Sequence, residues 1–470
     1  MTTFHSALRK LSNTFTLFKQ AVTGGDHDFT TGSIRRAVLL LAIPMMLEMV
    51  MESVFALVDL YFVGHLPHSS YAIQTVGLTE SVLAIIYSLA IGMGMAATAV
   101  VARRIGEHDT VEASKAGMQT ISIALIISVV IGIVGFYFAT DLLILMGASR
   151  QTASLGTNFT RIMMGESLII VLLFLINGIF RGAGNAAIAM RSLLIANIAN
   201  TILCPICINV LGLGLTGAAV ATTIGRGLGV CYQCYHLFNG KHLLKARLAY
   251  LRPQWQQARA ILKIAMPGIF QFLISSCSWI FLAQLVARLG GDRGSAGYQT
   301  AIRILMFFLL PAWGMSNAAA TLVGQNLGAH QAERAEESVF KNMRYIVVYM
   351  AFVTVISLVA GNTLSAVFTN DAGVRHVAAV ALRIMSPGYI LYGIAMVMMS
   401  AFNGAGDTWA TTKLNFIGFW VFQVPLAYLF ALGFKWGTTG VFMAIPIAYT
   451  FIAISSYLLF KRGGWKKVKV

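Results

Sequence analysis

Long apolar segments, separated by short polar or glycine-rich breaks, run through most of the chain. A helix needs about 20 mostly apolar residues to cross a bilayer, and such runs recur from near residue 37 to near residue 460. They lack the roughly ten-residue alternating segments of outer-membrane strands. The pattern predicts an all-α integral membrane protein with twelve transmembrane helices, at 37–63, 74–101, 117–139, 155–180, 186–210, 216–238, 259–289, 295–325, 338–360, 377–403, 409–433 and 438–460.

The composition agrees with a membrane protein. Of the 470 residues, 57% are hydrophobic and 11% are charged, whereas soluble domains carry about 25% charged residues. A net charge of +17 would point to nucleic acid in a soluble protein, but between membrane helices the placement of the charge decides its meaning. We therefore expect the lipid bilayer, and no nucleic acid, as a partner.

Lys and Arg are concentrated in alternate breaks between the predicted helices. Because cytoplasmic loops carry an excess of these residues, the asymmetry predicts an even number of crossings with both termini inside. No cleavable signal peptide is evident, and the interpretation is a multi-pass protein of the bacterial cytoplasmic (inner) membrane. The residues on the predicted cytoplasmic side are Arg35, Arg36, Arg103, Arg104, segment 241–263 and the tail 461–470.

The two halves of the chain align when the sequence is shifted by 222 or 223 positions. Segments beginning at residues 41, 92, 161, 180 and 214 match segments beginning at 263, 314, 383, 402 and 437. These matches predict a duplication, and hence two pseudo-symmetric six-helix bundles that run in the same direction through the membrane. The predicted parts are a cytoplasmic tail 1–36, either an amphipathic helix or disordered, an N-lobe 37–238, a cytoplasmic linker 239–258, a C-lobe 259–460 and a basic cytoplasmic tail 461–470.

Two bundles related by an axis along the membrane normal predict a central cavity near the midplane, which rocking of the bundles opens to either side. Duplication alone leaves a solid interface open as the alternative. Pro44 and Pro267 interrupt the first helix of each bundle, and a proline inside a helix removes an amide and permits a kink. We predict that both prolines act as hinges.

Three acids lie in the first apolar segment, residues 41–66. At about 100° per residue, Glu52 lies about 40° and Asp59 about 20° from Glu48, so all three share one face of the helix. A charge within the hydrocarbon costs at least ~2.5 kcal/mol. This face is therefore predicted to point toward a wet or polar interior.

These acids are candidates for ion coupling. Desolvation and mutual repulsion disfavour the charged form of neighbouring carboxyl groups, so the acids can load and release protons. Carboxylates with amide or hydroxyl oxygens can equally hold Na⁺, and acids that only hydrogen-bond to neighbouring helices are a third possibility. The repeat places Gln271, Ser275 and Leu282 opposite the three acids, so we expect the coupling in the N-lobe.

With its proline, its acid face, the "VDLYFVG" ending of the first helix and its twofold repeat, the chain resembles the multidrug and toxic compound extrusion (MATE) family over residues 35–460. The resemblance implies a secondary active antiporter that exports amphipathic, often cationic organic compounds by alternating access. The wider superfamily also contains flippases, so a flippase for a lipid-linked or other amphiphilic metabolite is the alternative.

The resemblance also implies a site in the N-lobe. In this family it joins the aspartate that ends the first helix to an Asn-x-x-x-Asp-Pro segment and to a threonine one helix later. Asp59 matches the first aspartate, Asn200 the asparagine, and Thr222 lies near the threonine, but Cys204 occupies the position of the second aspartate. Because a neutral thiol is a poor ligand for Na⁺, this departure favours H⁺ as the coupling ion.

Cargo is expected between the bundles, where Met and aromatic side chains offer adaptable apolar surface and acids attract cations. Glu166 has two alternative roles, in the pocket or site, or as a structural partner of Arg161 or of another helix. The candidate cavity residues are Phe55, Met93, Glu166, Gln271 and Met396.

The sequence argues against an enzyme. It has no clustered His, metal-ligand set or activated nucleophile at catalytic spacing and no Walker-type loop. The pairs Cys204/Cys207 and Cys231/Cys234 lie inside predicted membrane helices, where small buried thiols are a better interpretation than zinc or redox chemistry. We expect no metal and no cofactor, an ion gradient as the energy source, small organic molecules as partners, and a monomer.

Overall fold

The computed structural model describes residues 15–25, 27–64, 66 and 69–470, and the side chain of Asp59 lies outside the described part. Helices dominate, and no strand occurs in these residues. Ten helices are long and apolar enough to cross a bilayer. One of them, α10 (Trp255–Gly328), doubles back at Gly291, and α9 (Gly214–Phe238) adds a further membrane-length helix. The predicted twelve transmembrane helices are therefore confirmed.

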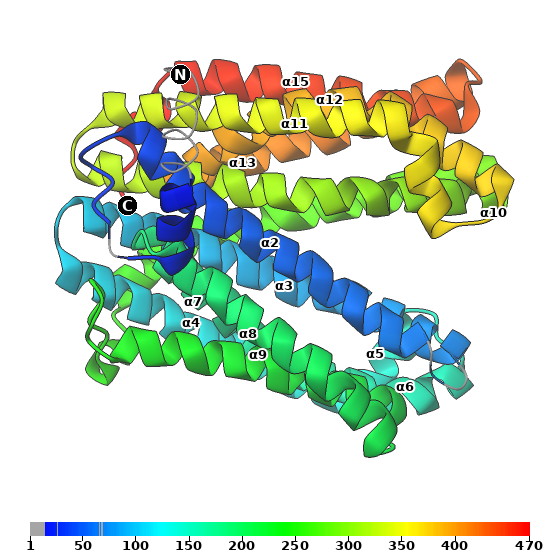
Figure 1. The fold of residues 1–470 in the computed structure, drawn as a ribbon, viewed down its shortest axis with the longest axis horizontal. Helices are drawn as coiled ribbons and strands as arrows, with labels where there is room; N and C mark the ends of the chain where they lie inside the picture. Colours follow the sequence, from blue (N-terminus) through cyan, green and yellow to red (C-terminus); the bar gives the residue numbers. More distant parts are fainter. Residues whose placement is uncertain (1–14, 26, 65, 67–68) are drawn as a thin grey trace, which may run out of the picture.

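The helices form two bundles that lie beside each other and diverge toward one end (Figure 1). Residues 15–23 form a short helix ahead of the bundles, with Phe15 and Phe18 exposed. The N-lobe consists of α2 (Ile34–Gly64), α3 (Ser69–Gly106), α4 (Thr110–Tyr137), α5 (Ala139–Leu145), α6 (Arg150–Gly165), α7 (Ser167–Gly182), α8 (Ala186–Pro205), the π-helix η1 (Ile206–Val210) and α9.

The C-lobe repeats this plan. After residues 239–254, which include the 3₁₀ turn η2 (Leu248–Leu251), it begins with the two halves of α10. The other elements are α11 (Ala332–Phe368), α12 (Ala372–Ala405), α13 (Thr408–Asn415), the π-helix η3 (Phe416–Gln423), α14 (Val424–Tyr428), the π-helix η4 (Leu429–Gly433), α15 (Gly437–Lys461) and the 3₁₀ turn η5 (Gly464–Lys467).

Two breaks depart from the predicted helix boundaries. The segment predicted as one helix over 155–180 consists of α6 and α7, which meet at Glu166. The segments predicted as two helices, 259–289 and 295–325, are joined without a loop through Gly291, whose backbone has φ 58° and ψ −156°. Only glycine adopts this conformation readily, so this residue makes the sharp reversal possible.

Polar side chains at the helix starts satisfy amides that have no partner within the helix. Asp371 begins α12 and accepts hydrogen bonds from the amides of Gly373 (2.7 Å) and Val374 (3.1 Å). The hydrogen bonds from Val374 and Gly373 hold the pKa of the Asp371 carboxyl below its usual value. Asp109 and Ser149 cap α4 and α6 in the same way.

The first helix of each lobe packs into the core of the other lobe before it reaches its proline. In α2, residues from Ala37 to Ala42 belong to the hydrophobic core of the C-lobe. In α10, Ile261, Ile264 and Ala265 belong to the core of the N-lobe. Pro44 and Pro267 lie inside these helices, and the contacts with the other lobe continue past them, through Met45 in α2 and Ile269 in α10. Both prolines therefore lie within the stretches that contact the other lobe.

The lobes meet most closely at the end that carries the C-terminus (Figure 1), through a seam formed by residues 103–106 of α3 and 325–328 of α10. A Cβ on Gly106 would overlap the carbonyl oxygen of Gln325, and a Cβ on Gly328 would overlap that of Arg103. These two contacts are related by the 222-residue repeat. The backbones can approach this closely only because both positions lack a side chain.

Hydrogen bonds reinforce the seam. The side chain of Gln325 donates to the carbonyl of Gly182 (2.9 Å), and Thr321 donates to that of Arg181 (3.0 Å). Arg334 of α11 donates to the carbonyls of Phe29, Thr31 and Gly32, which precede α2. The C-lobe thus holds both α7 and the N-terminal segment, and the lobes diverge only toward the opposite end.

Gly106→Ala is expected to open or strain the seam, because the new methyl group meets a backbone carbonyl that cannot rotate away. Overpacking of this kind costs about 1–3 kcal/mol. The thermal unfolding midpoint of the purified protein should fall. Gly77→Ala in the same helix is the control, since nothing lies within 4 Å of a Cβ there. Equal midpoints for the two variants would contradict the role given to the seam.

Candidate functional site

A cavity of about 530 Å³ lies between the two lobes. The N-lobe wall comes from α2, α3, α6, α7 and α9, and includes Met49, Glu52, Ser53, Phe55, Glu80, Tyr87, Met95, Met163, Phe174, Arg181 and Arg226. The C-lobe wall comes from α10 and α12, and includes Phe272, Ser276, Leu310, Trp313, Asn317, Ser400 and Asn403. The predicted central cavity is therefore present.

The two walls differ in chemistry. Four charged side chains lie on the N-lobe wall, Glu52, Glu80, Arg181 and Arg226, and none of the described lining residues from the C-lobe is charged. On the C-lobe side the rings of Phe272 and Trp313 stack with centroids 5.9 Å apart and planes 12° apart. A molecule in this cavity meets charge on one side and flat apolar surface on the other.

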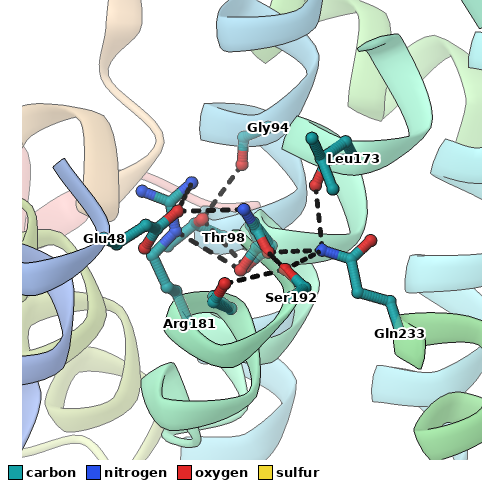
Figure 2. A network of polar contacts seen from close by, with 10 residues as sticks. Glu48, Gly94, Thr98, Leu173, Arg181, Ser192 and Gln233 are labelled. Atoms are coloured by element: carbon teal, nitrogen blue, oxygen red, sulfur yellow. Dashed lines mark hydrogen bonds and ion pairs between the residues drawn. The ribbon is translucent and has the colours of Figure 1, made fainter. Parts of the chain in front are cut away.

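Glu48 lies behind the N-lobe wall, fully buried, in a polar network (Figure 2). Its Oε1 accepts a hydrogen bond from Asn177 (2.9 Å) and lies 3.8 Å from the guanidinium of Arg181. Oδ1 of Asn177 accepts hydrogen bonds from the hydroxyl of Ser192 and from Nε2 of Gln233. Nε2 of Gln233 also donates to the hydroxyl of Ser192. The network joins helices α2, α7, α8 and α9, so Glu48 is held by three neighbouring helices.

A second buried pair lies beside the cavity. Glu166, at the junction of α6 and α7, accepts a hydrogen bond of 2.8 Å from Arg226 of α9. The same guanidinium donates to the hydroxyl of Tyr87 (2.7 Å) and lies over the ring of Phe55, 4.9 Å from its centroid. The structure therefore gives Glu166 a partner on another helix, Arg226, which itself lines the cavity.

Glu52 lines the cavity one turn beyond Glu48. Glu52 lies close enough to Arg226 for electrostatic attraction and close enough to Glu48 for electrostatic repulsion. The three carboxyl groups Glu48, Glu52 and Glu166 thus share the interior of the lobe with two guanidinium groups. Mutual repulsion among acids, expected from the sequence, is offset by these arginines.

The sequence interpretation missed Arg181 and Arg226, which lie close to the buried acids and line the cavity. The position of each arginine in the sequence could have indicated this. Arg226 falls inside a predicted membrane helix, and Arg181 directly follows another. Ionisable residues inside membrane helices usually pair with one another. An acid face on one helix should therefore have prompted a search for arginines on the others.

The positions matched by family resemblance come together in part. Asn200 donates a hydrogen bond of 3.1 Å to the hydroxyl of Thr222, and Cys204 lies buried one turn further along α8. Asp59 belongs to α2, but its side chain is outside the described part. Within the described residues no group of three or more His, Cys, Asp and Glu side chains is placed to hold a metal ion.

The predicted cavity residues fall into two groups. Phe55 lines the central cavity, and Gln271 and Met396 line an adjoining pocket of about 290 Å³ in the C-lobe. Met93 and Glu166 are absent from the described linings of both. Met93 is fully buried in the hydrophobic core of the N-lobe, and its neighbour two residues on, Met95, takes the position at the cavity. A shift of two residues turns the side chain by about 200°.

Comparison with known proteins gives one family. The family model described as MatE matches residues 44–206 and 267–429, two stretches that start at Pro44 and Pro267 in the register of the internal repeat. "Probable multidrug resistance protein YpnP" of Bacillus subtilis is 23% identical over 450 residues, 94% of this chain and 98% of that protein.

Solved structures agree with this result. An outward-facing multidrug resistance MATE family transporter of the MOP superfamily superimposes with a TM-score of 0.88 at 27% identity, covering 94% of this chain and 98% of that one. A MOP superfamily transporter from Pyrococcus furiosus, described as having a binding pocket of reverse polarity, gives the same TM-score, identity and coverage.

Arg181→Met is expected to destabilise the protein by about 3–5 kcal/mol, because it leaves the buried Glu48 without its counter-charge. The double variant with Glu48→Gln should lose at least ~0.5 kcal/mol less stability than the sum of the two single losses, because the two residues act as a pair. Arg303→Met, on an exposed part of α10, is the matched control. Chemical unfolding of the wild type, the two single variants, the double variant and the control measures these differences, and strictly additive losses would show that the two side chains do not interact.

Proposed function

Because this chain belongs to the MATE family of multidrug transporters, we propose that it is a secondary active antiporter that exports amphipathic, often cationic organic compounds in exchange for H⁺. The family membership, with membrane-spanning helices and alternating access, is the premise. Multidrug export is what the names of similar proteins state, including the YpnP protein of Bacillus subtilis. The cargo class and the coupling ion are the parts proposed for this chain.

The observation that carries the proposal is the cavity between the lobes, with a carboxylate on one wall and stacked aromatic rings on the other. Glu52 attracts a cationic group, whereas Phe272 and Trp313 accept the apolar part of the same molecule. An amphipathic cation meets both requirements. A proton and a cation both neutralise Glu52, so binding of one disfavours binding of the other.

The coupling site in this proposal consists of Glu48, Glu52 and Asp59, together with Asn200, Cys204 and Thr222. H⁺ is favoured over Na⁺ because a thiol stands where a second hard oxygen ligand would be needed. One proton entering down ~100 mV provides about 2.3 kcal/mol, and each pH unit adds about 1.4 kcal/mol. For a neutral cargo these two terms together give roughly several hundredfold concentration. For a cargo with one positive charge the exchange moves no net charge, and only the pH term remains, which gives about tenfold per pH unit.

The alternative is a flippase for a lipid-linked or other amphiphilic metabolite. Such a protein needs a cationic cavity for phosphate groups, and the reverse polarity stated for the Pyrococcus furiosus transporter shows that this fold occurs with different pockets. Arg181 and Arg226 lie on the cavity wall here, but Glu52 and Glu80 accompany them. This balance of charges favours the antiporter.

In the proposed orientation the closed end of the molecule faces the cytoplasm. The seam carries Arg103 and lies at the end of the molecule that holds the C-terminus (Figure 1). An excess of Lys and Arg marks the cytoplasmic side of inner-membrane proteins. The cavity then opens toward the outside, as expected for a transporter about to release its cargo.

Proteoliposomes that take up a fluorescent organic cation test this function. With pH and Na⁺ gradients imposed separately, the pH gradient alone should drive uptake, and Glu52→Gln should reduce that uptake at least ~tenfold. Glu112→Gln, which only breaks a half-exposed pair with Lys115, should leave it intact. Uptake driven only by the Na⁺ gradient would show that Na⁺, and not H⁺, is the coupling ion. Full activity of the Glu52 variant would show that this residue is not part of the site.

Pro44→Ala tests the hinge. Restoring the missing backbone hydrogen bond should stiffen α2 where it passes between the lobes, and so slow the uptake rate without loss of the folded protein. Pro267→Ala in the C-lobe should act in the same direction, whereas Pro253→Ala, in the exposed linker, serves as the control. Undiminished uptake by both hinge variants would end the hinge hypothesis.

A further inference from the structure

A further groove, with a volume of about 370 Å³, lies on the surface of the C-lobe between α10, α13 and η3. It shares no described lining residue with the central cavity or with the pocket beside that cavity. Its lining is apolar apart from Thr412 and Lys413, and the side chains of Phe270, Trp409 and Phe416 in it are about half exposed. Because these helices span the membrane, the groove opens toward lipid.

Positive charge gathers at one end of this groove. Lys413 lines it, and Arg259 and Lys263 lie on the face of α10 that carries Phe270 and Ile274, all four within about 60° of helix rotation. The three basic side chains are exposed, and none of them forms a hydrogen bond or an ion pair with another described residue. A negatively charged group in the groove therefore meets three cations.

The basic end of the groove lies at the seam end of the molecule. A Cβ on Gly406, just ahead of α13, would lie 3.7 Å from Val468, whose carbonyl accepts a hydrogen bond from Arg103 of the seam. In the orientation proposed above, this end faces the cytoplasm. Trp409 agrees with that level, since tryptophan is enriched at membrane interfaces. The three cations therefore lie near the headgroups of the cytoplasmic leaflet.

The internal repeat shows what occupies the corresponding place in the N-lobe. At a shift of 222 residues, Arg191 of α8 corresponds to Lys413 of α13. The guanidinium of Arg191 donates to the backbone carbonyls of Val22 and Thr23, at the end of the helix formed by residues 15–23. The N-lobe thus covers its basic residue with acceptor oxygens from its own N-terminal segment.

The C-lobe has no such segment over Lys413. The chain ahead of α10 is the linker, and it lies against α4 of the N-lobe instead. There the side chains of Gln119 and Ser122 donate to the carbonyls of Arg252 (2.6 Å) and Leu251 (2.9 Å). The place that the N-lobe fills with its own chain is therefore an open groove in the C-lobe.

We propose that this groove binds one anionic phospholipid of the cytoplasmic leaflet. The acyl chain lies against Phe270, Trp409 and Phe416, and the phosphate accepts hydrogen bonds from Lys413 and Lys263, as the backbone carbonyls do from Arg191. Basic pockets between helices on the cytoplasmic side bind anionic headgroups, and long basic side chains reach toward the interface. The site is separate from the cargo cavity and goes beyond the proposed transport function.

The lipid in this site contacts the two helices where they meet at the hinge position of the C-lobe. Thr412, in the lining, donates to the carbonyl of Pro267 (2.7 Å), and Thr408 donates to that of Ile264 (2.8 Å). Occupation of the groove therefore holds α13 against α10 beside Pro267.

Native mass spectrometry of the delipidated full chain tests the site. Phosphatidylglycerol and phosphatidylcholine with the same acyl chains are titrated separately, and the dissociation constant of the first bound lipid is measured. Wild type should bind phosphatidylglycerol more tightly, and Lys263→Gln/Lys413→Gln should weaken that binding about 10- to 30-fold while leaving phosphatidylcholine unchanged. Lys241→Gln/Lys467→Gln, which removes the same charge from the exposed linker and tail, should keep the wild-type affinity.

A second pair of variants tests the place of the acyl chain. Ile417→Trp fills the groove and keeps its cations, so it should weaken phosphatidylglycerol binding, whereas Val359→Trp, on an exposed position of α11, should not. Equal affinities of the wild type and Lys263→Gln/Lys413→Gln overturn the proposal. An equal loss in both double variants overturns it as well, because net charge alone then explains the binding. Full affinity of Ile417→Trp overturns the placement of the lipid in the groove.

Discussion

Charge can stay inside the N-lobe only in partnership with opposite charge, and this constraint shapes the rest of the site. Glu48 and Glu166 each contact an arginine from another helix, Arg181 and Arg226. An isolated charge in this environment would cost several kcal/mol, so the helices that carry these residues must stay together. Both guanidinium groups also reach the cavity wall. The pairing that holds the lobe together therefore also sets the polarity of the surface that cargo meets.

The duplication makes the two lobes similar in shape, but the two lobes differ in the charged residues that they carry. The seam repeats almost exactly in both lobes, because Gly106 and Gly328 each admit the backbone of the other lobe. The sites do not repeat, since Gln271 and Asn403 stand where the N-lobe has Glu48 and Arg181. A transporter of this kind needs two bodies of similar shape that rock about a common axis, but an ion-dependent step in only one of them is enough to drive the cycle.

The exchange of helices connects shape with movement. Each lobe contains the first segment of the other lobe's first helix, to just past Pro44 or Pro267. Rocking of the lobes must therefore bend or slide these two helices, and a proline is where a helix resists bending least. The glycine contacts at the seam lie on the same side as the exchanged segments (Figure 1), so opening this side requires both to change together.

Hydropathy, periodicity and the repeat were sufficient to predict the all-α membrane fold, the twelve crossings and the two lobes, because these depend on the local preference of a segment for lipid or water. The acid face of α2 followed from helix geometry alone. The partners of the buried acids did not, because Arg181 lies more than a hundred residues from Glu48 and Arg226 lies 60 residues from Glu166 along the chain, and only packing brings each pair together. Packing also placed Met95 rather than Met93 at the cavity, since the rotation of a helix about its axis is set by its neighbours.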